Sequence, residues 1–158
     1  MSTTPPTAGT TPFWRRPLVV STSETRSAET AQTPGMRRFA AISGGLVGSR
    51  GLWMGGNTVK AGETSGDHHH GPAESGIYIV SGNPQFVFLT DGEEVTVHAG
   101  PGDFVYVPAW VPHREENLGR EEDAIVVLAR TTPEEIVVNL DSLWSTDGID
   151  GADEAPRP

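Results

Sequence analysis

Short apolar runs bounded by Gly, Pro, Asn and Asp fill the middle of this 158-residue sequence. Seven such runs occupy residues 51–62, 75–82, 84–92, 93–102, 102–110, 112–118 and 122–131. The residues between them, such as Gly82-Asn83-Pro84 and Asp91-Gly92, are typical of tight hairpin connections. Seven strands at this spacing, with no convincing long helix, predict an all-β fold, either an antiparallel sandwich or a barrel.

The length of the chain favours one domain, which we place at 37–144. Residues 1–36 contain nine Thr, four Ser and five Pro, half of the segment. Such a composition cannot repay the entropy of ordering, so we expect a partly disordered arm. Within it, "FWRRPLVV" (13–20) could form a strand that docks on this chain or on a neighbour. Residues 145–158 are expected to form an acidic, disordered tail.

Two segments allow more than one interpretation. Residues 131–144 could begin a helix at Thr132-Pro133, yet "IVVNL" within them also fits a strand. The Gly-rich stretch 43–51 lacks the Gly-Lys-Ser/Thr ending of a phosphate-binding loop. We therefore expect a flexible loop there.

Composition excludes several classes of function. The formal net charge of −10 makes nucleic acid an improbable partner, since a polyanion would be repelled. The absence of cysteine excludes disulfides, thiolate zinc sites and cysteine nucleophiles. No segment has the apolar length of a signal peptide or of a membrane-spanning helix. We expect a cytoplasmic protein without a membrane partner.

Three of the five histidines are consecutive, in "GDHHHGPAESG" (66–76). On a strand, side chains at positions i and i+2 share a face, so His68 and His70 should point together and His69 away. Two imidazoles with this spacing can hold one ion. Glu74 and a third imidazole would complete a mixed nitrogen and oxygen site for a divalent transition metal. His113 is the natural third donor.

The stretches around these histidines together resemble the two motifs of the cupin family. The first pattern, G(x)5HxH(x)3–4E(x)6G, is approached by Gly62, His68, His70, Glu74 and Gly82. The second, G(x)5PxG(x)2H(x)3N, is approached by Gly102, Pro108, His113 and Asn117. The resemblance covers roughly residues 40–130, and both motifs occur in order. It implies a single-domain cupin jelly-roll β-barrel with His68, His70, Glu74 and His113 as metal ligands.

Two positions depart from these patterns. Seven residues, not six, separate Glu74 from Gly82, so Ser75 occupies the place that the usual spacing gives the carboxylate. A bulge after Gly71-Pro72 could return Glu74 to the metal; otherwise the site is three histidines with water. Trp110 stands where the second motif has glycine and would make that loop bulkier.

The resemblance implies a metal-dependent enzyme acting on a small, anionic organic substrate. Three imidazoles and one carboxylate leave two adjacent positions of an octahedral ion open. We expect one divalent ion per chain, with Fe2+ favoured and Mn2+, Ni2+, Zn2+ or Co2+ as alternatives. An Fe(II)-dependent oxygenase, a dioxygenase above all, is favoured. An isomerase or epimerase, a decarboxylase, a lyase and a non-catalytic small-molecule-binding cupin are the alternatives.

Other side chains are candidates for roles beside the metal. Alternation puts Glu115 on the face of His113, as a general base, a hydrogen-bond acceptor or merely a surface acid. Tyr78, if turned inward, would bring a phenol to the metal. Arg130 could neutralise a substrate carboxylate or cap the end of the barrel. Family resemblance further implies a homodimer formed through an exchanged N-terminal strand, for which 13–20 is the candidate.

Overall fold

The computed structural model describes residues 18–21, 36–145 and 149. The described part consists of strands and one short helix. In chain order these are β1 (Met36–Ile42), α2 (Gly44–Val47), β2 (Trp53–Val59), β3 (His68–His69), β4 (Ser75–Ser81), β5 (Gln85–Thr90), β6 (Glu93–His98), β7 (Phe104–Val107), β8 (His113–Glu116), β9 (Ala124–Arg130) and β10 (Val138–Asn139). None of the described helices has the length and apolar character needed to cross a membrane.

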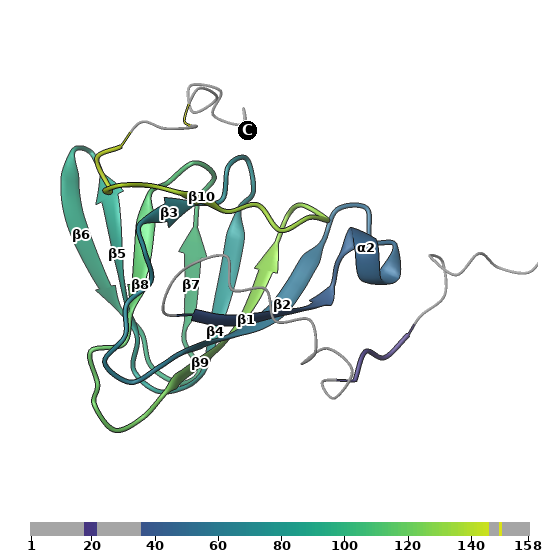
Figure 1. Cartoon of the computed structure of the whole chain (residues 1–158), viewed down its shortest axis with the longest axis horizontal. Helices are drawn as coiled ribbons and strands as arrows, with labels where there is room; N and C mark the ends of the chain where they lie inside the picture. The colour runs from purple at the N-terminus through teal and green to yellow at the C-terminus, as the bar shows by residue number, and fades with distance from the viewer. Residues whose placement is uncertain (1–17, 22–35, 146–148, 150–158) are drawn as a thin grey trace, which may run out of the picture.

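The strands form two five-stranded antiparallel sheets that face each other (Figure 1). Sheet A has the order β1-β2-β9-β4-β7, and sheet B has the order β10-β3-β8-β5-β6. Strands that neighbour each other in a sheet are mostly distant in sequence, as the pairing of β2 with β9 illustrates. This arrangement confirms the predicted all-β, jelly-roll fold class.

The hydrophobic core lies between the two sheets. Alternate side chains of sheet A point inward, among them Ile77 and Ile79 of β4 and Leu128 of β9, all fully buried. Phe86 and Phe88 of β5 meet them from sheet B. Period-two alternation thus gives each sheet one core face, and the apolar area removed from water there drives folding.

The seven predicted runs correspond to β2 and β4–β9, each shorter at its ends than the run that indicated it. Strand β1 was not predicted, and β3 lies outside the seven runs, although the expected alternation of the histidines at 68–70 assumed a strand there. The ambiguous segment 131–144 forms β10 and turns and no helix. The Gly-rich stretch, expected to be a loop, holds the one-turn helix α2, whose N-terminus is capped by Ser43 Oγ.

The predicted docking strand 13–20 lies largely outside the described residues. Its described part, residues 18–20, has no strand pairing, and Val19 is 94% exposed. Most of the predicted acidic tail also lies outside the described residues.

Strand β1 lies close to β2 at Gly55. A Cβ atom added there would lie 2.1 Å from the carbonyl oxygen of Phe39 and 2.6 Å from Cη2 of Trp53. Neither atom can move freely, because one belongs to a paired strand and the other to a buried indole ring. Glycine at position 55 is therefore needed for β1 to join sheet A.

We predict that Gly55→Ala lowers the free energy of unfolding by about 1–3 kcal/mol, since the added methyl group overpacks this contact. Gly51→Ala is the control, because a Cβ atom there meets nothing within 4 Å. Chemical denaturation followed by circular dichroism measures both variants. Equal stability of the two would contradict the role assigned to Gly55.

Candidate metal centre

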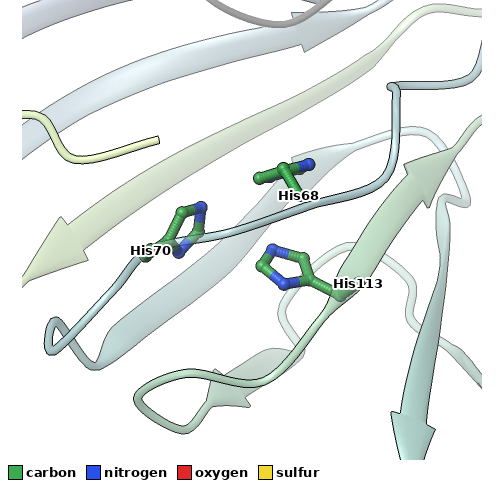
Figure 2. Close-up of side chains that lie close together, drawn as sticks. All are labelled: His68, His70 and His113. Atoms are coloured by element: carbon green, nitrogen blue, oxygen red, sulfur yellow. The ribbon is translucent and has the colours of Figure 1, made fainter. Parts of the chain in front are cut away.

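Three histidines from two segments meet inside the sandwich. His68 of β3 is paired directly with His113 of β8, and His70 comes immediately after the end of β3. Ring centroids lie 4.4 Å apart for His68 and His113, 4.7 Å for His70 and His113, and 5.1 Å for His68 and His70. Figure 2 shows the three rings converging. One ligand nitrogen from each ring lies within 4.8 Å of the others.

Backbone carbonyl groups orient two of these rings. Nδ1 of His68 is 2.9 Å from the carbonyl oxygen of Gly66, and Nδ1 of His113 is 2.9 Å from that of Val111. A carbonyl oxygen only accepts, so each Nδ1 carries the proton and donates. Each Nε2 is then left with a free lone pair. Both Nε2 atoms are buried and have no hydrogen-bond partner among the described residues.

His70 has the same tautomer but a different partner at Nε2. Its Nδ1 lies 2.8 Å from Ser75 Oγ, and its Nε2 lies 3.0 Å from Nη2 of Arg130. A guanidinium group only donates, so the Nε2 lone pair of His70 accepts this hydrogen bond. A metal ion could use that lone pair only after Arg130 has moved away.

Burial keeps the three rings neutral. It is the main cause that lowers the pKa of His68 and of His70 well below the usual value, and it lowers the pKa of His113 to about 4. Neighbouring imidazole and guanidinium groups act in the same direction. The neutral imidazole is the form that binds metals.

The three nitrogen atoms fit a small divalent cation. Bonds of about 2.1 Å from ring nitrogens to a metal allow at most about 4.2 Å between two of its ligand atoms. The observed separations, all within 4.8 Å, need only a small closure of the rings. Two unpaired, buried lone pairs pointing into one space are otherwise costly, and a bound cation would satisfy both.

Glu74 lies apart from this cluster. Its Oε1 accepts a hydrogen bond of 2.5 Å from the hydroxyl group of Tyr106, and the contact is exposed. Ser75, which the motif spacing puts in the place of the carboxylate, is the residue that contacts His70. The extra residue between Glu74 and Gly82 therefore places Ser75, not Glu74, beside the histidines. No bulge compensates for it. Its role as a ligand stays a prediction.

Glu115 lies where alternation from His113 places it, on the inward face of β8. The side chain is fully buried, and its Oε2 accepts from Nδ2 of Asn57 at 3.1 Å. Its Oε1 has no partner in the described structure. Burial raises the pKa of Glu115, although Arg38 and Arg130 oppose the shift.

The sequence left the direction of Tyr78 open, and in the structure its side chain faces away from the histidines. Without a bulge before it, β4 alternates regularly, so Ile77 and Ile79 face the core and Tyr78 faces outward. Its ring packs against Phe104 at 4.9 Å between centroids. His69 points away from the cluster, as predicted, but is buried beside Trp110. His98 is exposed, as expected.

Two buried arginines belong to the surroundings of the histidines. Arg38 of β1 donates from Nη1 to Oε1 of Glu135 at 3.0 Å. Arg130 of β9 donates to the carbonyl oxygen of Ile136 at 3.2 Å, lies 5.1 Å from the ring centre of Trp53, and has no direct ion pair in the described structure. Burial lowers the pKa of Arg130 to about 9.

The sequence did not identify Arg38. For Arg130 it left two roles open, neutralising a substrate carboxylate or capping the end of the barrel. Arg38 could have been found only by recognising "MRRFAAI" as a strand whose third residue points inward. The two consecutive arginines hid this alternation, because Arg37 and Arg38 face opposite sides.

The comparisons with known proteins agree with this fold. The sequence model of the cupin domain matches residues 57–129. A search of curated proteins found no match. Among solved structures, an oxalate decarboxylase described for its substrate binding mode and reaction specificity is 24% identical, with a TM-score of 0.65 over 73% of this chain and 31% of that chain.

Two further solved structures come from named bacteria. Oxalate decarboxylase from Bacillus subtilis at pH 4.6 is 23% identical, with a TM-score of 0.64 over 72% of this chain and 30% of its own. The formate complex of the Lactobacillus farciminis enzyme is 17% identical, with a TM-score of 0.62 over 68% and 32%. This chain therefore spans about a third of the length of those enzymes, and the likeness shows the fold alone.

Both histidine motifs lie within or beside the matched segment, and their histidines converge between the sheets of a jelly roll. Residues 57–129 are therefore similar to a cupin domain, and the fold around them is that of a jelly roll.

Proposed function

We propose that this protein is a metal-dependent enzyme that decarboxylates a small organic acid. The observation that carries the proposal is the pair of buried Nε2 atoms of His68 and His113 without a hydrogen-bond partner, beside Arg130, which forms no salt bridge with an acidic side chain among the described residues. A cation would satisfy the two Nε2 lone pairs, and an anion would offset the charge of the Arg130 guanidinium group.

The three imidazoles of His68, His70 and His113 would hold the ion. Mn2+ is our first choice, because a related structure concerns the Mn(II) centres of Bacillus subtilis oxalate decarboxylase. When bound, such an ion supplies Lewis acidity that polarises a carboxylate oxygen. The iron expected from the motifs has no comparable support. With Glu74 apart from the cluster, all ligands from the chain are neutral, which favours an anionic substrate.

The charges of the buried groups support a carboxylate as that substrate. Arg38 is neutralised by Glu135, whereas Arg130 is not paired directly with any acidic side chain in the described structure. A divalent ion held by neutral rings beside Arg130 would leave a concentration of positive charge in a desolvated space. A small anion, a dicarboxylate above all, would offset this charge.

Arg130 would change partners when the ion binds. Once the lone pair of His70 Nε2 is engaged, Nη2 of Arg130 loses its acceptor, while Nε already has none. These two N–H groups point in the same direction from one edge of the guanidinium plane. That edge matches the two oxygens of a carboxylate, so Arg130 would orient the substrate.

Glu115 would hold the proton that the reaction consumes. Decarboxylation breaks the bond to CO2 and leaves an electron pair on carbon, which a proton must take up. Oε1 of Glu115 is buried and has no partner, and the carboxyl group shares the inward face of β8 with His113. We assign Glu115 as the general acid on this placement.

A metal-loaded sample should bind one Mn2+ per chain, and His113→Ala should reduce this to a substoichiometric amount, because one of the three donors is lost. His98→Ala is the matched control, since His98 is exposed and outside the cluster. Isothermal titration of metal-free protein measures both. Full occupancy in His113→Ala would contradict the assignment. Glu74→Gln should retain the metal, and loss of it there would restore Glu74 as a ligand.

Arg130→Met should have two opposite effects. Mn2+ should bind about 10-fold more tightly than in the wild type, because the donor that competes for His70 Nε2 is removed, along with a positive charge. Oxalate, used as the carboxylate probe, should bind the Mn2+-loaded variant at least about 100-fold more weakly, since the bidentate partner is lost.

Arg38→Met is the companion variant for these titrations, because Arg38 is equally buried but paired with Glu135. It should affect oxalate binding less than Arg130→Met does. Thermal unfolding checks that both variants remain folded. Unchanged oxalate affinity in a folded Arg130→Met protein would exclude Arg130 as the anchor of the carboxylate.

Release of CO2 and uptake of oxygen distinguish decarboxylation from oxygenation. With Mn2+ and a panel of small mono- and dicarboxylic acids, we expect CO2 release without stoichiometric oxygen uptake. Glu115→Gln should abolish CO2 release while leaving Mn2+ binding intact. Oxygen consumed in proportion to product, measured with an oxygen electrode, would instead support the dioxygenase that the motifs favoured.

A further inference from the structure

An apolar cleft lies between edge strands of the two sheets, β6 of sheet B and β7 of sheet A. Its volume is about 240 Å³, and we call it the edge cleft. The residues that line it carry no charge and are Phe88, Thr90, Val95, Val97, Tyr106, Pro108 and Val111. Pockets that enclose a whole drug-sized ligand measure about 300–1,000 Å³, so the edge cleft suits one part of a molecule.

One wall of the edge cleft belongs to the core face of sheet B. Val95 is paired with Phe88, and Val97 is paired with Phe86. Residues directly opposite each other in an antiparallel sheet share a face, so both valines point to the side of the core. They are nevertheless 44% and 39% exposed, whereas Phe86 is fully buried. The core face of sheet B therefore extends beyond the part that sheet A covers.

Strand register places the edge cleft beside the histidines. Val95 of β6 lies opposite Phe88 of β5, and Phe88 lies opposite His113 of β8. The pairing of His113 with His68 continues this row. The rings of Phe88 and His113 are stacked, with centroids 5.8 Å apart. Val111, whose carbonyl oxygen accepts from Nδ1 of His113, also lines the edge cleft.

A second row connects the edge cleft with Glu115. Val97 lies opposite Phe86, and Phe86 lies opposite Glu115. Both rows change from apolar to polar side chains between β5 and β8. Neighbouring strands are about 4.8 Å apart, so the apolar end of each row begins about 5 Å from β8 and extends to about 10 Å. A molecule lying along these rows would meet polar groups at one end and apolar groups at the other.

We propose that the edge cleft holds an apolar substituent of the substrate. The substrate is then a small dicarboxylic acid with an alkyl or aryl group on the carbon atom that loses CO2. This rests on the proposed function, in which the cation held by the histidines and Arg130 bind the carboxylates. The uncharged lining of the edge cleft complements the substituent, and the apolar area removed from water would contribute to affinity.

A monosubstituted malonate satisfies the chemistry of this placement. The bond between its central carbon and one carboxylate breaks, and that carboxylate leaves as CO2. The electron pair stays on the central carbon, where the second carboxylate delocalises it. The proton held by Glu115 then forms a C–H bond at this carbon, and the product is a substituted acetate. The reaction needs no oxidant. Oxalate has no carbon that could bear the substituent.

Isothermal titration of the Mn2+-loaded, full-length protein with malonate, ethylmalonate, butylmalonate and benzylmalonate tests the proposal. Each methylene group that is fully buried should tighten binding about 4-fold. Butylmalonate should therefore bind at least about 30-fold more tightly than malonate, even with incomplete burial. The readout is the ratio of these two affinities, because changes in metal loading affect both ligands alike. Glu115→Gln protein repeats the titration without turnover.

Two variants of the edge cleft should lower this ratio. Exchange of both Val95 and Val97 for Thr keeps shape and charge but adds two hydroxyl groups, whose water the substituent would remove, and should lower the ratio at least about 5-fold. Val97→Trp should fill the edge cleft and have the same effect. Val80→Thr is the matched control, since Val80 is 47% exposed on β4 and does not line the edge cleft. Thermal unfolding checks that all variants are folded.

The possible outcomes separate this proposal from the proposed function. Equal affinity for malonate and butylmalonate would overturn the proposal and leave the proposed function intact. Failure of every malonate to bind the Mn2+-loaded protein would contradict the proposed function, and the proposal would fall with it. An unchanged ratio in both folded cleft variants would place the substituent elsewhere. A smaller mass of Val97→Trp in sedimentation velocity would show that a second copy of the chain covers the edge cleft, which also overturns the proposal.

Discussion

The hydrogen bonds that orient the imidazole rings determine most of what the site can do. The Nδ1–H groups of His68 and His113 donate to the carbonyl oxygens of Gly66 and Val111, and that of His70 donates to Ser75 Oγ. All three Nε2 lone pairs therefore face a common space. Burial keeps the rings uncharged, so the space can receive a cation without first releasing protons from the ligands.

Within this arrangement His70 differs from the other two histidines. Its Nε2 accepts a hydrogen bond from Arg130, so this buried lone pair is satisfied. The Nε2 atoms of His68 and His113 have no hydrogen-bond partner in the described structure. The guanidinium group therefore satisfies the lone pair of only one of the three rings. Under the proposed function, a cation at His70 Nε2 would release Nη2 of Arg130 toward a carboxylate, which would link the binding of the two ligands.

The strands, the jelly-roll class and the three histidines could be predicted, because alternation and turn residues are local signals and the two motifs preserve their spacing. The placement of Glu74 depended on a backbone bulge that the sequence left open, and the pairing at the start of β4, where Ser75 lies opposite Val107 and Arg130, decided it. The direction of Tyr78 depended on the same bulge and was left open for the same reason. Arg38 and its pairing with Glu135 join residues 97 positions apart, a contact that no local pattern reveals.

Arg130 lies close to both faces of sheet A. Its side chain contacts His70 in the interior, while the residue also lines a hollow of about 260 Å³ on the outer side of the sheet, beside Gly76 and Ala129. Only one layer of sheet separates the buried histidines from the outer side. A carboxylate on the inner side of this layer would meet Arg130 in a desolvated space, where a charge interaction is stronger than in water.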